Sequence, residues 1–106
     1  MSDLSDRTRL ALEADGPLAQ KLAGYTVRDA QRRLAAAIAD AIDDRATLIA
    51  EAGTGTGKTY AYLVPALLSG QRTIISTGTR ALQDQLYHRD LPRVRDALGA
   101  LSLIHI

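Results

Sequence analysis

Apolar residues recur at helical spacing along most of the chain, and the pattern is interrupted at glycines, prolines and acidic turns. It predicts a helix over residues 4–14 and a short helix over 17–22, which together form an N-terminal extension. A longer helix is predicted over residues 26–42, and Thr26 with Asp29 three positions later resembles a capping box. The first helix is expected to bury Leu4, Thr8, Ala11 and Leu12, and the long helix Leu34, Ala37, Ile38, Ala41 and Ile42.

Two short apolar runs between the predicted helices have the character of strands. Residues 46–50 (ATLIA) are expected to form a buried parallel strand, and residues 72–76 (RTIIS) a second one. A helix is predicted between them over residues 58–69, interrupted by Pro65 and ended by Gly70. Further helices are expected from residue 80 to about 88 and from Pro92 to Gly99. Strand, helix and strand in this order predict a βαβ unit, although two strands do not complete a sheet.

Length and composition restrict the class of protein. The 106 residues are 46% hydrophobic and 24% charged with a net charge of +1, which is typical of an ordinary globular protein and allows one small domain. The sequence contains no cysteine, which excludes disulfides and thiolate metal ligands within it. No apolar run reaches the ~20 residues of a membrane span, and the first residues lack a signal-peptide core. We therefore expect a cytoplasmic protein without membrane contact.

Residues 51–60 (EAGTGTGKTY) carry the clearest chemical signal. They follow a predicted strand, precede a predicted helix, and match the phosphate-loop pattern G-x-x-x-x-G-K-[ST] except that Ala52 replaces the first glycine. Backbone N–H groups at such a turn and helix start attract anions, Lys58 would reach the outer phosphates, and the Thr59 hydroxyl would bind Mg²⁺. The alternative is an ordinary glycine-threonine turn. The residues expected to hold the phosphates are Gly53, Thr54, Gly55, Thr56, Gly57, Lys58 and Thr59.

Two further segments flank this loop. Tyr25-x-x-Arg28-x-x-Gln31 precedes it, and residues 74–92 (IISTGTRALQDQLYHRDLP) follow it. With EAGTGTGKT, these segments resemble superfamily 2 DNA helicases of the DinG/XPD group, most closely its bacterial YoaA-like members. The resemblance runs from about residue 24 to 99 and includes the alanine that breaks the strict pattern. Taken alone, the first segment favours the alternative in which Tyr25 is a hydrophobe at a helix entry and Gln31 a surface residue. Its position ahead of a phosphate loop reverses that preference.

The resemblance implies a partial RecA-like P-loop NTPase domain, an α/β fold with a parallel sheet and flanking helices, which this chain would contain only in truncated form. It implies ATP and Mg²⁺ as cofactors, with Lys58 and Thr59 as catalytic residues and Thr59 as the magnesium ligand. Adenine recognition would fall to Tyr25, Arg28 and Gln31. Single-stranded DNA would be the partner, and its phosphates would contact Thr77, Thr79 and Arg80.

In such a helicase, ATP hydrolysis would drive 5′-to-3′ movement on single-stranded DNA. The second acidic metal motif, the iron–sulfur cysteines and the second motor domain of the group would lie downstream of this chain, so the chain alone is expected to be inactive. We divide the sequence into an N-terminal helical extension (1–23), the front part of the ATP-binding domain (24–100) and a non-native tail (101–106). The alternatives are a nucleotide-binding module without hydrolysis and an RNA helicase of the same superfamily.

The last six residues, LSLIHI, follow the end of the resemblance. One possible coding of them resembles the end of a sequencing-library adapter, which suggests a cloning or assembly scar and a truncated gene model. The alternative is a genuine third strand, because the segment is apolar. Tyr60 and Tyr62, in the predicted helix after the phosphate loop, are expected to pack in the protein and not to stack on bases.

Overall fold

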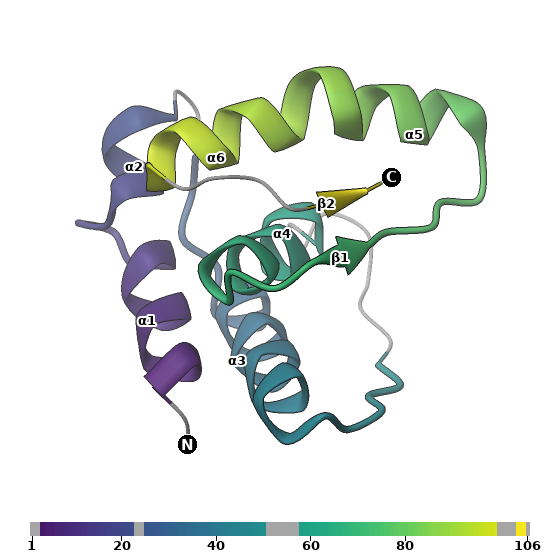
Figure 1. Ribbon diagram of the computed structural model, residues 1–106. Coiled ribbons are helices and arrows are strands. Elements are labelled where there is room, and N and C mark those ends of the chain that lie inside the picture. Colours follow the sequence, from purple (N-terminus) through teal and green to yellow (C-terminus); the bar gives the residue numbers. More distant parts are fainter. Residues whose placement is uncertain (1–2, 23–24, 51–57, 100–103, 106) are drawn as a thin grey trace.

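The computed structural model describes residues 3–22, 25–50, 58–99 and 104–105, and this part of the chain is mainly helical (Figure 1). None of its helices is long and apolar enough to cross a bilayer. The elements in chain order are α1 (Asp3–Leu12), α2 (Pro17–Lys21), α3 (Asp29–Asp44), α4 (Lys58–Leu68), β1 (Thr73–Ile74), α5 (Arg80–Gln85), the π-helical turn η1 (Leu86–Asp90), α6 (Leu91–Leu98) and β2 (Ile104–His105).

The N-terminal helices α1 and α2 follow the sequence prediction closely. The four residues expected to form the buried face of α1 are all buried, and α1 contacts both α3 and α4. The turn between α1 and α2 requires a glycine, because a Cβ atom on Gly16 would lie 2.5 Å from the backbone oxygen of Leu10. The N-terminal extension is therefore part of the packed body of the protein.

Helix α3 begins three residues later than predicted. Arg28, with φ −134° and ψ 130°, is its extended N-cap and makes no side-chain capping bond, so the capping box predicted for Thr26 and Asp29 is wrong. The helix ends at Asp44, and the N–H of its C-cap Arg45 donates to the carbonyls of Ala41 and Ile42. The left-handed φ of 53° at Arg45 turns the chain so that the next N–H, that of Ala46, reaches the Ala41 carbonyl at 2.9 Å.

The buried face of α3 also differs from the prediction. The predicted stripe, which includes Ile38 and Ile42, is only half-buried, whereas the buried residues of α3, which contacts both α1 and α4, lie on a neighbouring face. That face is rich in alanine, whose small side chains let two helices approach closely. Periodicity favoured the larger side chains, whereas the helix contact selects the smaller ones. The residues buried on α3 are Gln31, Ala35, Ala36 and Ala39.

The predicted strands are mostly absent from the described residues. Residues 46–50 form no strand and are exposed, with Leu48 at 42% and Ile49 at 94% exposure, so the prediction of a buried strand here is wrong. The second predicted strand, residues 72–76, is present only as the two residues of β1. β1 pairs in parallel with β2, with Thr73 opposite Ile104 and Ile74 opposite His105. A buried parallel strand needs paired neighbours and helices over both faces. Among the described residues, residues 46–50 have no such neighbours.

Residues 80–98 form one continuous helical run instead of two separate helices, and this run crosses one side of α4 in Figure 1. Between its α-helical parts, the N–H of Leu91 donates to the Leu86 carbonyl five residues back, which is the π-helical spacing. Pro92 follows at once, lacks an N–H, and would clash with a carbonyl in a regular helix interior. The wider turn lets the chain continue through the proline, and Gly99, with φ 66°, ends the run as predicted.

Helix α4 lies at the centre of the core. It contacts α1 and α3 and, on the opposite side, α6. As predicted, Leu63, Ala66 and Leu67 are buried, Pro65 lies inside the helix, and Gly70 follows it with φ 66°. Tyr60 and Tyr62 pack against the core, as expected. The cluster around α4 joins Leu12 and Leu18 from the N-terminal helices to Leu86, Leu91, Val94 and Ala97 from the long helical run.

Candidate functional site

The first turn of α4 carries two of the residues predicted to bind a nucleotide. Lys58 is the first residue of the helix and is exposed, and Thr59 follows it and is partly buried. The N–H groups of a helix start carry partial positive charge, which favours an anion there. Both side chains therefore stand where a phosphate group would be attracted. The predicted phosphate-binding residues Gly53, Thr54, Gly55, Thr56 and Gly57 lie outside the described residues.

The neighbour of Thr59 one helical turn along α4 is Tyr62, and the two side chains are hydrogen-bonded. Burial raises the pKa of the Tyr62 hydroxyl, a hydrogen bond with the Thr59 side chain counteracts part of that rise, and the charge of Asp90 adds to it. Asp90, only 7% exposed, accepts a hydrogen bond from Arg89 Nε at 3.1 Å and contacts Gln85 Nε2 at 3.5 Å. Tyr62 thus links the start of α4 electrostatically to η1, a connection that no local sequence pattern indicates.

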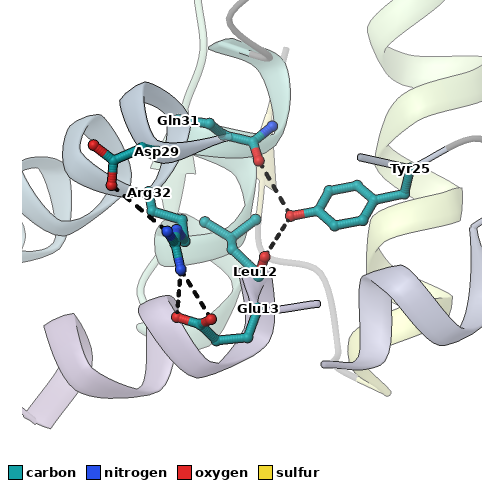
Figure 2. Close-up of polar contacts among 6 residues, drawn as sticks. All are labelled: Leu12, Glu13, Tyr25, Asp29, Gln31 and Arg32. Atoms are coloured by element: carbon teal, nitrogen blue, oxygen red, sulfur yellow. Dashed lines mark hydrogen bonds and ion pairs between the residues drawn. The ribbon is translucent and has the colours of Figure 1, made fainter. Parts of the chain in front are cut away.

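Tyr25 belongs to the predicted base-recognition segment (Tyr25, Arg28 and Gln31) and contacts the start of α4. Its ring centroid lies 5.8 Å from that of Tyr60, the residue after Thr59, with the rings inclined at 59°. Its hydroxyl donates to the carbonyl of Leu12 at 2.7 Å and lies 3.1 Å from Gln31 Oε1 (Figure 2). Burial raises the pKa of the Tyr25 hydroxyl to about 12.

Gln31 is almost fully buried, at 2% exposure, so the alternative of a surface glutamine is wrong. Its side-chain oxygen faces the Tyr25 hydroxyl. Arg28, the third residue of the segment, is exposed at the N-cap of α3. The structure therefore brings Tyr25 and Gln31 into contact, while Arg28 makes no hydrogen bond or ion pair with either.

An ion pair beside this contact joins α3 to the residue that follows α1. Arg32 Nη1 lies 2.9 Å from both carboxylate oxygens of Glu13, and Arg32 Nη2 lies 3.6 Å from Asp29 Oδ1 (Figure 2). Sequence reasoning missed Glu13 and Arg32, because they are 19 positions apart and only the packing of α1 on α3 brings them together. Leu12 and Glu13 thus contact both Tyr25 and the first turn of α3.

The residues predicted to contact DNA lie on one turn before α5. The Thr77 hydroxyl donates to the Thr79 carbonyl at 3.1 Å, and Thr79 Oγ1 caps α5 by accepting the Leu82 N–H at 3.2 Å. Thr79 and Arg80 are exposed and Thr77 is partly so. A hydroxyl that accepts a capping bond keeps its own proton for another acceptor. This turn can therefore present hydroxyl, N–H and guanidinium donors to a phosphate.

Comparison with protein families matches residues 29–100 to the DEAD/DEAH box helicases, which is more than half of the chain. The chain belongs to the DEAD/DEAH box helicase family. The matched range contains Gln31, Lys58, Thr59 and the turn before α5, whereas Tyr25 and α1 precede it. A domain of this family implies a RecA-like fold, of which the described residues show the helices and one short pair of strands.

Individual relatives have names that agree with this family. The chain is 57% identical over 84 residues to "ATP-dependent DNA helicase YoaA" of Escherichia coli K12, covering 79% of this chain and 13% of the relative. It is 52% identical over 93 residues to the Haemophilus influenzae protein of the same name, covering 85% and 14%. It is 47% identical over 79 residues to "ATP-dependent helicase DinG" of Mycobacterium tuberculosis H37Rv, covering 71% and 12%. The chain thus spans about one seventh of these helicases, and no solved structure matches it significantly.

The metal-binding capacity of the described residues is small. They contain no group of three or more histidine, cysteine, aspartate or glutamate side chains that could hold a metal ion. Because the sequence has no cysteine, it cannot supply thiolate ligands to an iron–sulfur cluster. The Thr59 hydroxyl at the start of α4 is the one predicted magnesium ligand in the described part of the chain.

Proposed function

We propose that this chain forms the nucleotide-binding start of an ATP-dependent DNA helicase, whose complete form couples ATP hydrolysis to 5′-to-3′ movement on single-stranded DNA. The observation that carries the proposal is the placement of Lys58 and Thr59 on the first turn of α4, inside the segment that matches the helicase family. The names of its relatives, "ATP-dependent DNA helicase YoaA" and "ATP-dependent helicase DinG", support the same activity.

ATP with Mg²⁺ fits the chemistry of these residues. Lys58 offers an exposed ammonium group at the positive end of α4, which suits the outer phosphates. Thr59 offers a hydroxyl oxygen, a hard ligand of the kind that Mg²⁺ prefers. When bound, the metal neutralises negative charge on the phosphates. In this proposal Lys58 holds and stabilises the outer phosphate, Thr59 orients the metal, and the N–H groups of residues 53–57 complete the anion site.

The base and the nucleic acid are assigned to two other parts of the chain. Tyr25, Arg28 and Gln31 would recognise adenine, supported by the contact of Tyr25 with Tyr60 beside the phosphate helix. Thr77, Thr79 and Arg80 would contact phosphates of single-stranded DNA without reading its sequence, supported by the exposed donors of that turn. A bacterial DNA helicase meets its DNA in the cytoplasm, where we place this protein.

We further propose that the complete protein builds the parallel sheet of a RecA-like domain against one face of this chain. A groove of about 440 Å³ runs between α3, α4 and β1, and its lining is mainly apolar. It contains Ile38 and Ile42, the residues that periodicity predicted to be buried, together with Ile74, which is 78% exposed. Strands covering this groove would bury the predicted apolar stripe of α3.

The downstream part of the protein can be tested from its gene. The proposal expects the reading frame of the native locus to continue past the codon for Gly99 into an acidic metal motif and a cysteine cluster that binds iron and sulfur. It also expects codons other than those of LSLIHI after residue 100. A frame that stops after Ile106 would favour the nucleotide-binding module without hydrolysis.

The activity is tested by removing the lysine charge in the complete protein. Lys58→Ala should reduce single-stranded-DNA-stimulated ATP hydrolysis by about 100-fold or more, because the outer phosphate loses its cationic partner. Lys21→Ala, which removes the chain's other lysine from α2, should leave the rate unchanged. Equal rates of hydrolysis in the two variants would contradict the proposal.

A further inference from the structure

Leu12, the last residue of α1, and Glu13, which follows it, contact the two ends of the region that carries the base-recognition residues Tyr25, Arg28 and Gln31. The Leu12 carbonyl accepts the Tyr25 hydroxyl at 2.7 Å, and both Glu13 carboxylate oxygens lie 2.9 Å from Arg32 Nη1. Arg32 directly follows Gln31 in the first turn of α3, and Gln31 faces the Tyr25 hydroxyl (Figure 2). Leu12 and Glu13 therefore contact Tyr25 directly and the first turn of α3, which carries Gln31, through Arg32.

The Glu13 contact is the stronger of the two ion pairs that Arg32 makes. Glu13 and Arg32 are both partly buried, whereas Asp29 is 74% exposed and lies 3.6 Å from Arg32 Nη2. Arg32 Nε is buried without a hydrogen-bond partner, so the terminal nitrogens alone fix the orientation of the guanidinium. A short, partly buried, charge-assisted contact holds geometry better than a long exposed one, which solvent screens.

We propose that Glu13 is a positioning residue for base selection, which makes the N-terminal helix a working part of the nucleotide site. Through Arg32 it fixes the first turn of α3, so that the Gln31 amide stays oriented with its oxygen toward Tyr25. This inference rests on the proposed function, in which Tyr25 and Gln31 contact the base.

The orientation of the Gln31 amide matters because adenine and guanine carry different exocyclic groups at position 6. Adenine carries an N6 amino donor where guanine carries an O6 acceptor, so a fixed arrangement of one acceptor and one donor on the protein matches only one of them. An amide that is free to rotate by 180° can match either base. Sites with fixed hydrogen-bonding groups reject the wrong partner strongly, because the mismatch leaves buried polar groups unpaired. Loss of the Glu13 contact should therefore weaken the discrimination between ATP and GTP more than it weakens the affinity for ATP.

The test measures equilibrium binding of fluorescent N-methylanthraniloyl derivatives of ATP and GTP, with Mg²⁺, to the complete protein. The wild-type protein is expected to prefer the adenine nucleotide. Glu13→Gln should lower the ratio of the two affinities by about 10-fold, mainly through tighter GTP binding. Asp29→Asn is the matched control, since it also neutralises a carboxylate beside Arg32, and it should leave the ratio unchanged. Glu13→Asp, which keeps the charge, should recover part of the selectivity.

Two further variants distinguish an effect on the packing of α1 from an effect on the choice between ATP and GTP. Leu4→Ala weakens the docking of α1 at its other end, so it should lower the thermal midpoint without changing the affinity ratio. An unchanged ratio in Glu13→Gln, with a lost ratio in Gln31→Ala, would overturn the inference and leave the proposed function standing. A wild-type protein that binds both nucleotides equally, or neither, would overturn the adenine assignment and this inference together.

Discussion

Tyr25 shows how several contacts meet at a single side chain. Its ring lies against Tyr60 on α4, its hydroxyl bonds to the end of α1, and Gln31 of α3 lies beside it. The family resemblance singled out Tyr25 and Gln31 together, and the structure brings the two side chains into contact. The sequence could not identify their partners Leu12, Glu13 and Arg32, since those contacts exist only after α1 has packed on α3.

The titration of Tyr25 gives a prediction at this scale. Burial raises its pKa from 10.0 to about 12 in the folded chain. As the pH rises, the unfolded chain releases this proton before the folded chain does. The neutral hydroxyl therefore makes its full contribution to the free energy of unfolding below pH 10, and that contribution is lost as the pH rises through about 12. In thermal melts over this range, Tyr25→Phe should lose less stability with rising pH than the wild type.

The exposed Tyr87 provides the control for that measurement. Tyr87→Phe removes a hydroxyl from a side chain that is 57% exposed, and it should reproduce the pH profile of the wild type. Parallel pH profiles for Tyr25→Phe and the wild type would show that the buried hydroxyl is not the group responsible.

At the scale of helices and strands, local patterns predicted the helices well and the strands poorly. Helices α1, α2 and α4 were predictable because helical periodicity and the glycine or proline at their ends act within a few residues. The burial of residues 46–50 depends on distant neighbours, and those residues are exposed here. The choice between the two faces of α3 was equally non-local, because it depends on which helix packs against it.

The face of α3 can be tested by enlarging an alanine. Ala39 is fully buried, so Ala39→Leu should force α3 away from its neighbours and destabilise the fold by about 1–3 kcal/mol. Ala37 belongs to the predicted stripe and is only half-buried, and Ala37→Leu should change stability by less than that. Thermal or urea unfolding of the two variants measures the difference. A larger loss of stability for Ala37→Leu than for Ala39→Leu would show that α3 buries the face that periodicity predicted.

On the scale of the whole molecule, the chain leaves large apolar side chains uncovered. Ile49 and Ile74 are 94% and 78% exposed, and the groove between α3, α4 and β1 adds further apolar surface. Exposed apolar surface and short strands with open edges favour association between molecules. The same surface is where we propose that the parallel sheet of the complete domain packs.

The isolated chain should therefore have marginal stability and a tendency to aggregate. Light scattering of the purified chain is expected to rise with concentration, and Ile49→Lys with Ile74→Lys should reduce that rise by placing charge on the exposed surface. Exposed Arg93→Lys, which keeps its charge, serves as the control substitution and should have no effect. A wild-type chain whose light scattering does not rise with concentration would contradict this expectation.

The most direct test of the central claim is whether the start of α4 binds the phosphates of a nucleotide. Calorimetric titration of this chain with ATP and Mg²⁺ should show binding by the wild type and by Lys21→Ala. The Lys58→Ala variant, in contrast, should bind at least about 10-fold more weakly, since its cationic contact with the phosphates is gone. Equal affinity in Lys58→Ala and Lys21→Ala would contradict the assignment of this helix start as the phosphate site, and with it the nucleotide-binding role proposed for the chain.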